Sequence, residues 1–236
     1  MTNRSSRVLA VGLGFALAAV ALVVFRRLAG GGFFHDDWTL LARGAGVLPP
    51  PPWPARPLAF DLYWRLLDPL PGYQPVIYTV TRFVVHLATG FVVSSIVRRL
   101  GGAEVAAWLA ATVYVLSPLA FEALYWAAAI TDLLANLGLL LAVLGLLRAD
   151  RKGLVLLLLG GVISLTSKET GWWLALAAGI VWWRSGRRSY LAAAVALLAL
   201  TGFSLLATAR GLEHDYAWTA GAVPWNLLRA GSWLVP

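Results

Sequence analysis

The feature that most constrains this chain is a set of apolar stretches that contain no charged residue. Residues 8–25 and 191–209 hold no Asp, Glu, Lys or Arg, and 60% of the 236 residues are hydrophobic while 13% are charged. Each stretch is close to the roughly 20 residues that a helix needs to cross a bilayer. Strands of a membrane barrel would alternate polar and apolar residues, which these stretches do not. They therefore predict membrane-spanning helices, because a soluble core could not bury so much apolar surface.

Seven apolar segments follow one another along the chain, and we expect each to be a membrane-spanning helix. Their approximate bounds are 8–25, 76–97, 103–117, 131–147, 153–167, 171–184 and 189–209. The first is longer than the apolar part of a signal peptide, and Arg26 and Arg27 after it make a poor cleavage site, so we expect a retained helix. The predicted fold class is an all-α, polytopic transmembrane helix bundle of about seven spans.

Basic residues gather in alternate short loops between these segments, and this pattern predicts the orientation of the chain. The clusters are Arg98-Arg99, Arg148/Arg151/Lys152 and Arg184/Arg187/Arg188. The positive-inside rule places them in the cytoplasm, together with Arg4, Arg7 and the N-terminus. Arg26 and Arg27 oppose this orientation, but the three later clusters outweigh them. The net charge of +8 is therefore explained by basic residues in these cytoplasmic loops, and we expect no nucleic-acid partner.

The acidic residues are segregated by the same topology. Nine of the eleven lie outside the membrane or near the outer ends of helices: Asp36, Asp37, Asp61, Asp68, Glu122, Asp132, Glu169, Glu213 and Asp215. Glu104 and Asp150 lie on the cytoplasmic side. The outer face is therefore where we look for chemistry.

The segment 26–75 is too long for a plain connection between two helices, and long loops of this kind are usually functional. Residues 38–41 and 60–67 mix aromatic, aliphatic and charged residues, which predicts two amphipathic helices at the membrane interface. The proline run 49–52 between them favours an extended polyproline conformation. We therefore expect a long first outer loop with two surface helices joined by a stiff strut.

We expect a single membrane module over residues 1–236. Its expected parts are the outer loop 26–75, helices two to seven over 76–209, and an outer segment 210–236. Residues 223–235 in that last segment are rich in Trp and Leu, like the approach to a further membrane segment. We expect either a chain truncated after the seven-helix module or a last segment that lies along the interface.

An acidic pair, Asp36-Asp37, follows directly on the first predicted helix. Adjacent carboxylates perturb each other's pKa, so a pair at a membrane surface can take a proton from an incoming hydroxyl or hold a divalent cation. A structural role is equally open, because either residue can cap the helix that is expected to begin near Trp38. The two roles are compatible.

Two further acids lie at the predicted outer rim. Glu122 is four residues before Trp126, so the two would share a face of a helix, and Asp132 follows at the start of the fourth segment. Acids in hydrocarbon cost about 2.5 to 3.5 kcal/mol at a helix centre, so these need partners or water. They are either parts of a polar site or members of structural ion pairs and helix caps.

The turn Ser167-Lys168-Glu169-Thr170-Gly171 lies between the fifth and sixth segments. Lys168 can bind a phosphate as a point charge. The local sequence favours a simpler interpretation, in which Lys168 and Glu169 neutralise each other in a hydrophilic turn.

Two ionisable residues, Arg82 and His86, lie four apart on one face of the second segment. Ionisable groups inside a membrane are functional candidates. In the structural alternative, Arg82 snorkels to the outer edge and His86 is a neutral, hydrogen-bonded core residue. Arg56, which precedes Pro57, is likewise either an anion contact or a surface charge.

Together these motifs resemble the conserved module of the GT-C superfamily, the membrane glycosyltransferases that use polyprenyl-phosphate-linked sugars. The likeness is strongest to the transmembrane and tetratricopeptide-repeat O-mannosyltransferases and their bacterial relatives, and it covers about residues 34–171. The shared elements are Asp36-Asp37, Arg56-Pro57, His86, the string Pro-x-x-x-Glu-Ala-x-x-Trp-x-x-x-x-x-Asp-Leu-Leu-Ala over 118–135, and Ser167-Lys168-Glu169. The string over 118–135 is the specific part. Ile130 departs from the Arg that the family often has there, and the family continues into further helices and repeats.

The resemblance implies transfer of a sugar, with inversion, from a polyprenyl-phosphate donor to a hydroxyl of a protein, lipid or glycan acceptor. The reaction would take place at the non-cytoplasmic face of a membrane, expected to be the bacterial inner (plasma) membrane. Asp36 or Asp37 would be the general base, and Lys168, Arg56 and Arg82 would be the candidates to stabilise the departing phosphate. The residues expected to orient the substrates are Glu122, Asp132, Trp126, His86 and Glu169.

A metal cofactor is left open by the resemblance. A divalent cation, Mg²⁺ or Mn²⁺, would be held by Asp36 and Asp37, because hard cations prefer carboxylate oxygens. The chain has no cysteine and three scattered histidines, which excludes thiolate metal sites and argues against a histidine zinc site.

Two other classes of protein compete with the glycosyltransferase. A lipid-sugar carrier or transporter would line a pathway with the intramembrane charges, although the broken helices and paired repeats of transporters are not visible in the sequence. A truncated, inactive family member would serve as a partner subunit. The glycosyltransferase hypothesis predicts that five residues converge on one outward-facing cavity: Asp36, Asp37, Glu122, Asp132 and Lys168.

Overall fold

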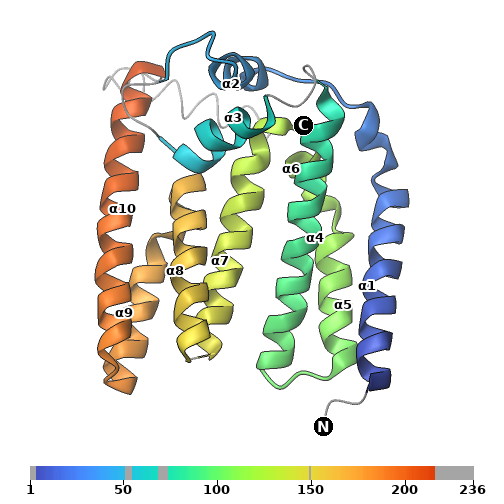
Figure 1. The fold of residues 1–236 in the computed structure, drawn as a ribbon, viewed down its shortest axis with the longest axis vertical. Coiled ribbons are helices and arrows are strands. Elements are labelled where there is room, and N and C mark those ends of the chain that lie inside the picture. Colours follow the sequence, from blue (N-terminus) through green and yellow to red (C-terminus); the bar gives the residue numbers. More distant parts are fainter. Residues whose placement is uncertain (1–3, 51–54, 69–73, 149, 216–236) are drawn as a thin grey trace, which may run out of the picture.

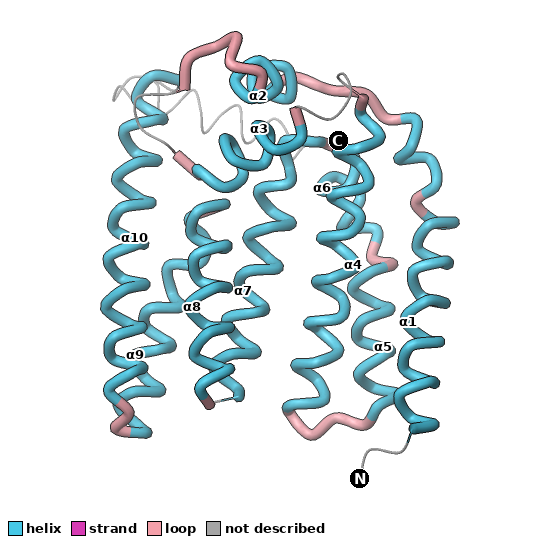
Figure 2. The backbone as a smooth tube through the Cα atoms, viewed as in Figure 1, coloured by secondary structure: helices cyan, strands magenta, loops and turns pink. Residues whose placement is uncertain are grey.

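The computed structural model describes residues 4–50, 55–68, 74–148 and 150–215, and this part of the chain consists of helices joined by loops and turns, with no strand (Figure 2). The predicted all-α fold is confirmed. The extended conformation predicted for residues 49–52 falls partly, and the segment predicted for 223–235 wholly, outside the described residues.

Seven long helices run side by side in the described part (Figure 1). They are α1 (Arg4–Val24), α4 (Pro75–Arg99), α5 (Glu104–Val115), α7 (Ile130–Arg148), α8 (Arg151–Ser167), α9 (Trp173–Ser185) and α10 (Arg188–Asp215). Each falls on one of the seven predicted apolar segments, so these segments located the helices correctly.

Three of the described helices are long and apolar enough to cross a membrane, over residues 75–99, 127–148 and 188–208. A fourth crossing results if α5 and the helical residues 118–125, which are bent by 44° against each other, count as one span. These helices mark the chain as a membrane protein, since apolar segments of this length match the bilayer core. Seven crossings and the orientation of the N-terminus stay predictions.

One end of the bundle, the basic end, contains the turns with the basic clusters. There the Arg99 guanidinium donates from Nε to the carbonyl of Leu147 at 3.3 Å and from Nη2 to that of Arg148 at 3.2 Å. These carbonyls end α7 and have no partner within the helix, so a cation stabilises them. Asp150 then begins α8 by accepting the Gly153 amide at 2.5 Å, as an N-cap does.

The helices α7 and α8 meet along paired glycines. A Cβ on Gly138 would lie 2.5 Å from the Gly160 carbonyl, and one on Gly145 would lie 2.4 Å from the Gly153 carbonyl. Likewise, a Cβ on Gly160 would lie 2.4 Å from the Gly138 carbonyl, and one on Gly153 would lie 2.5 Å from the Gly145 carbonyl. Small residues of this kind let two helix backbones touch, as in other membrane helix pairs. The two helices therefore form a close hairpin, the α7–α8 hairpin.

The opposite end, the loop end, is crossed by the residues between α1 and α4 (Figure 1). This loop forms η1 (Arg26–Gly30), α2 (Asp36–Gly44), η2 (Pro57–Leu62) and α3 (Tyr63–Leu67). Both predicted surface helices thus exist, and Trp64 and Ala59 in them are fully buried against the bundle. The short elements η3 (Pro118–Ala120), α6 (Phe121–Tyr125), η4 (Ala127–Ala129) and η5 (Glu169–Trp172) complete this end.

Candidate functional site

Asp37 is the acid of the predicted pair that lies in the protein interior. It is 0% exposed, and its Oδ1 accepts the Ala128 amide at 2.7 Å while its Oδ2 accepts the Phe34 amide at 2.8 Å. Burial raises the pKa of Asp37 above its ordinary value, although these amides and the charge of Arg82 act in the opposite direction. Asp37 therefore caps a helix, as one alternative predicted, but it caps the η4–α7 start 91 residues away rather than its own helix.

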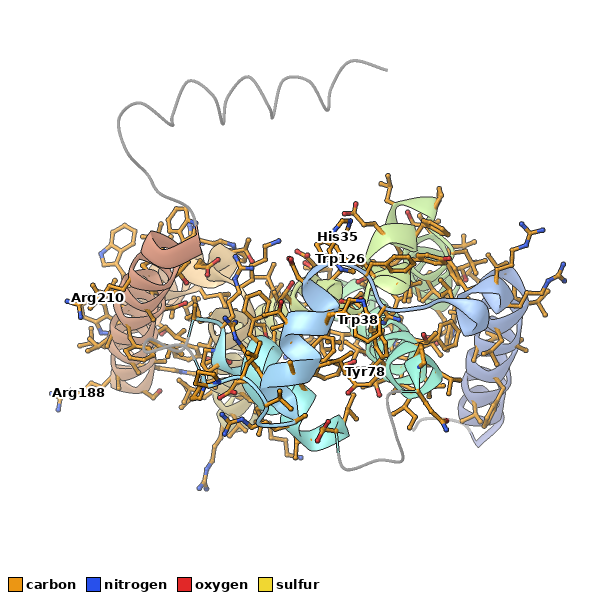
Figure 3. All side chains as sticks on the ribbon, turned by 90° about the horizontal axis from the view of Figure 1, so that it is seen from above. His35, Trp38, Tyr78, Trp126, Arg188 and Arg210 are labelled. Atoms are coloured by element: carbon orange, nitrogen blue, oxygen red, sulfur yellow. The ribbon has the colours of Figure 1, made fainter. Side chains whose placement is uncertain are left out.

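Asp36 is exposed at the first residue of α2, next to this anchored neighbour. His35 precedes it with φ +40°, which is unusual for a residue other than glycine. Beside it lies an open hollow of about 270 Å³, lined by Phe34, His35, Tyr125 and Trp126. Figure 3 shows His35 and Trp126 together at the loop end. An exposed carboxylate thus directly follows His35, a lining residue of the aromatic hollow, in the sequence.

Lys168 and Asp132 form an ion pair between the end of α8 and the first turn of α7. Their side chains are 30% and 44% exposed. The predicted neutralisation of Lys168 by Glu169 is therefore wrong, because Lys168 has an extended backbone at the break between α8 and η5, and its ammonium reaches the other helix of the hairpin. Asp132 lies four residues after Ala128, to which Asp37 is bound.

Arg56 and Glu169 form a bidentate ion pair, with Nε to Oε1 and Nη2 to Oε2 both at 3.1 Å. The hydroxyl of Thr208 on α10 also donates to Oε1 at 2.6 Å. Burial raises the pKa of Glu169, but the hydrogen bonds of Arg56 and Thr208 outweigh it and hold this pKa below its ordinary value. One carboxylate thus joins the loop, η5 and α10.

Arg82 and His86 both point into the protein from α4. Arg82 is 2% exposed, so the predicted snorkelling to the membrane edge is wrong: its Nε donates to the carbonyl of Tyr78 at 3.2 Å and its Nη2 to the hydroxyl of Thr79 at 3.0 Å. His86 is 1% exposed, and its Nε2 lies 3.0 Å from the carbonyl of Val115. The geometry of His86 matches the structural alternative, a hydrogen-bonded core residue.

Glu122 is exposed on α6, and its carboxylate has no partner among the described residues. Trp126 ends that helix, donating its amide to the carbonyl of Glu122 at 2.9 Å, and its ring lines the aromatic hollow. The α6 helix ends at Tyr125 because Trp126 has an extended backbone, with φ −92° and ψ 122°.

A divalent cation does not fit the described side chains. Both oxygens of Asp37 already accept backbone amides, which leaves Asp36 as a single carboxylate, and no group of three or more metal-ligating residues exists in the described part of the chain. Mg²⁺ and Mn²⁺ need several oxygen ligands, and a lone exposed carboxylate is a weak site.

The candidate residues are thus gathered at the loop end in three contacts: Asp37 with Ala128, Lys168 with Asp132, and Arg56 with Glu169. Asp36 and Glu122 lie at the same end without joining these contacts. The hollow has none of the five predicted residues among its lining groups. The common cavity therefore stays a prediction.

Three partners of the site were not predicted from the sequence. The amides of Ala128 and Phe34 carry no side-chain signal at all, and Thr208 is a hydroxyl inside an apolar segment. Only the position of Thr208 at the outer end of that segment, level with the other candidates, could have singled it out.

No family model, no curated protein and no solved structure matches this chain.

Proposed function

We propose that this chain is an integral membrane glycosyltransferase of the GT-C type. It would move a sugar from a polyprenyl-phosphate donor to a hydroxyl acceptor at the non-cytoplasmic face. One observation carries the proposal: the acidic pair, Arg56, the start of α7 and the Lys168-Glu169 turn come from distant parts of the sequence and meet at one end of the bundle through three polar contacts. Structural helix ends alone would not require these separate motifs to meet.

Asp36 is the better candidate for the general base, because its carboxylate is exposed whereas both oxygens of Asp37 are occupied by amides. In the proposed reaction the acceptor hydroxyl gives its proton to Asp36 while its oxygen bonds to the anomeric carbon of the sugar. The bond between that carbon and the phosphate oxygen breaks, and the polyprenyl phosphate leaves with the electron pair. A single displacement of this kind inverts the anomeric configuration.

Lys168 and Arg56 are the candidates to stabilise the leaving phosphate. Their side chains are 30% and 25% exposed, and each is paired with a carboxylate, so both stand near the surface of the loop end. A phosphate can replace a carboxylate as the partner of a lysine or an arginine, since both anions accept charge-assisted hydrogen bonds. Positive charge at this point would stabilise the negative charge that develops on the leaving group.

The acceptor would approach over the aromatic hollow. The rings of Phe34, Tyr125 and Trp126 line this hollow and offer an apolar surface. Asp36 directly follows the lining residue His35 in the sequence, and Glu122 is exposed on α6, the helix that precedes Trp126. Pockets that bind small molecules combine apolar walls with a few polar groups in this way.

Purified protein in nanodiscs tests the proposal with a panel of polyprenyl-phosphate sugars and hydroxyl acceptors. We expect a radiolabelled sugar to move to the acceptor with inversion, and we expect no transfer from soluble nucleotide sugars. Donor binding without any transfer across the panel would instead favour the lipid-sugar carrier or the inactive partner subunit.

A further inference from the structure

The carbonyl of Val115 loses its helical partner where α5 ends. Ser117 has an extended backbone with φ −60° and ψ 127°, as a residue before proline prefers, and this ends the helix. The amide of Leu119, four residues after Val115, donates instead to the hydroxyl of Ser117 at 3.3 Å. Because Val115 is 0% exposed, its carbonyl needs another donor from within the protein.

His86 on α4 supplies that donor. Its Nε2 lies 3.0 Å from the carbonyl of Val115, which is 29 residues away in the sequence. A carbonyl oxygen only accepts, so Nε2 must carry the hydrogen. The other ring nitrogen, Nδ1, is buried and has no hydrogen-bond partner in the described part of the chain. The imidazole therefore makes one hydrogen bond, and this bond joins two helices.

Packing around the ring holds His86 against the end of α5. The ring stacks on Tyr114 with 5.0 Å between centroids and 29° between planes, and Phe25, which follows α1, meets it edge-on at 6.3 Å. One turn further along α4, a Cβ on Gly90 would collide with the side chain of Val115. The two helices thus approach each other closely at the level of the break.

The break determines where α6 lies. Residues 118–125 are bent by 44° against α5, and they end in Tyr125, whose ring lines the aromatic hollow. On the other side of the hollow, Phe34 stacks on Tyr125 with 5.7 Å between centroids and 28° between planes. Asp36 follows Phe34 by two residues. One wall of the hollow is therefore built from the short helix that follows the break.

We propose that His86 is a positioning residue that binds the freed carbonyl of Val115 and thereby sets the direction in which α6 leaves the end of α5. The hydrogen bond and the break do not depend on the proposed function, whereas the use of the hollow by an acceptor rests on it. This assignment narrows the substrate-orienting role that the sequence suggested for His86. With 1% of its surface exposed, the ring acts through α5 and α6 rather than by touching a substrate.

Spin-label distances across the break test the proposal without reference to activity. The chain has no cysteine, so Val105→Cys on α5 and Leu119→Cys after the break can be labelled cleanly, and both side chains are exposed. We expect His86→Leu to shift or broaden the distance distribution in nanodiscs, because the carbonyl of Val115 loses its donor. His86→Gln, whose amide nitrogen can donate from about the same place as Nε2, should keep the wild-type distribution.

Thr81→Val is the matched control, because the Thr81 hydroxyl donates to a carbonyl of its own helix, that of Ile77, at 2.9 Å. Its distances should equal those of the wild type. If His86→Leu does not fold, His86→Asn replaces it, since the shorter side chain does not reach the carbonyl. An unchanged distribution in the variant without a donor would overturn the proposal. A shift in His86→Gln as large as in His86→Leu would also overturn it, by assigning the break to ring packing.

Steady-state transfer kinetics test the link to the hollow. We expect His86→Leu to raise the KM for the acceptor on the order of tenfold with the KM for the donor unchanged, and His86→Gln to restore the acceptor KM. An unchanged acceptor KM in a variant whose distances have shifted would overturn the link to the hollow. If the wild type transfers no sugar, the proposed function fails, and the spin-label distances alone decide on the role of His86 at the break.

Discussion

The α7–α8 hairpin and the outer loop are attached to the bundle in opposite ways. In the hairpin, backbone touches backbone at the Gly138/Gly160 and Gly145/Gly153 pairs, and one partly exposed ion pair, Lys168 with Asp132, joins α7 to the end of α8. The loop is attached by ionisable side chains, above all Asp37 and Arg56. The hairpin therefore rests mainly on steric fit, which pH and salt leave unchanged, whereas the candidate site rests on contacts that protonation or an anionic ligand can exchange.

The largest loss of stability is expected where the backbones of α7 and α8 lie closest together. Gly145→Leu would drive a side chain into the Gly153 carbonyl, which lies 2.4 Å from the site of a Cβ. Overpacking costs typically about 1 to 3 kcal/mol, and we expect the upper end here because the obstacle is backbone. Thermal unfolding in detergent measures it. Gly202→Leu on α10 is the matched control, since nothing lies within 4 Å of its Cβ position. Equal losses in both variants would contradict the close hairpin.

A smaller loss is expected when the loop attachment at Glu169 is removed. Glu169→Gln leaves Arg56, which is 25% exposed, without its ionic partner, and we expect about 1 to 2 kcal/mol of lost stability. Limited proteolysis between residues 45 and 57 should accelerate at the same time, because the loop loses its tie to η5 and α10. Asp61→Asn, which removes the exposed ion pair with Arg65, serves as the control. Unchanged proteolysis in Glu169→Gln would show that this pair does not hold the loop.

Low pH should weaken the attachment of the loop but not the contact between α7 and α8. The pKa of Glu169 is lowered in the folded protein, so its contribution to stability is complete above the ordinary value of 4.5 and is lost as the pH falls through the lowered pKa. Wild-type protein should therefore lose melting temperature below about pH 4.5, and Glu169→Gln should lose less over the same range. Parallel curves for the two proteins would show that Glu169 is not the acid-sensitive attachment.

The smallest effect is expected for the pair of Lys168 and Asp132. Their side chains are 30% and 44% exposed, so water screens the attraction, and either Lys168→Met or Asp132→Asn should cost no more than about 1 kcal/mol. Activity should respond more strongly than stability in Lys168→Met, because the proposed reaction uses its charge. A stability loss as large as that of Gly145→Leu would show that this pair holds the α7–α8 hairpin together rather than serving the candidate site.

Helix positions were readable from the sequence because one physical rule governs them. Long apolar runs are costly to leave in water, and each run became a helix within a few residues of its expected bounds, as residues 76–97 did in α4 despite Arg82. The same rule does not reveal which helices touch. The glycines of the α7–α8 hairpin are spread over two apolar runs, and only their facing positions give them a role.

The candidate site was predictable as a set of residues but not as a set of contacts. Neighbours in sequence suggested that Lys168 and Glu169 neutralise each other, whereas the break after α8 turns the two side chains to different partners, Asp132 and Arg56. In one alternative Arg82 was expected to reach the membrane edge, because the sequence does not show that this side chain is buried in the protein. Both errors arise from long-range packing, which local spacing does not encode.

The most direct test of the central claim is the rate of sugar transfer by Asp36→Asn compared with Asp61→Asn. Both replacements remove one acid from the loop and keep the shape of its side chain, but only Asp36 is the proposed base. We expect Asp36→Asn to lose turnover by a factor on the order of a hundred to ten thousand, while Asp61→Asn keeps the wild-type rate. Equal turnover in Asp36→Asn and the wild type would contradict it.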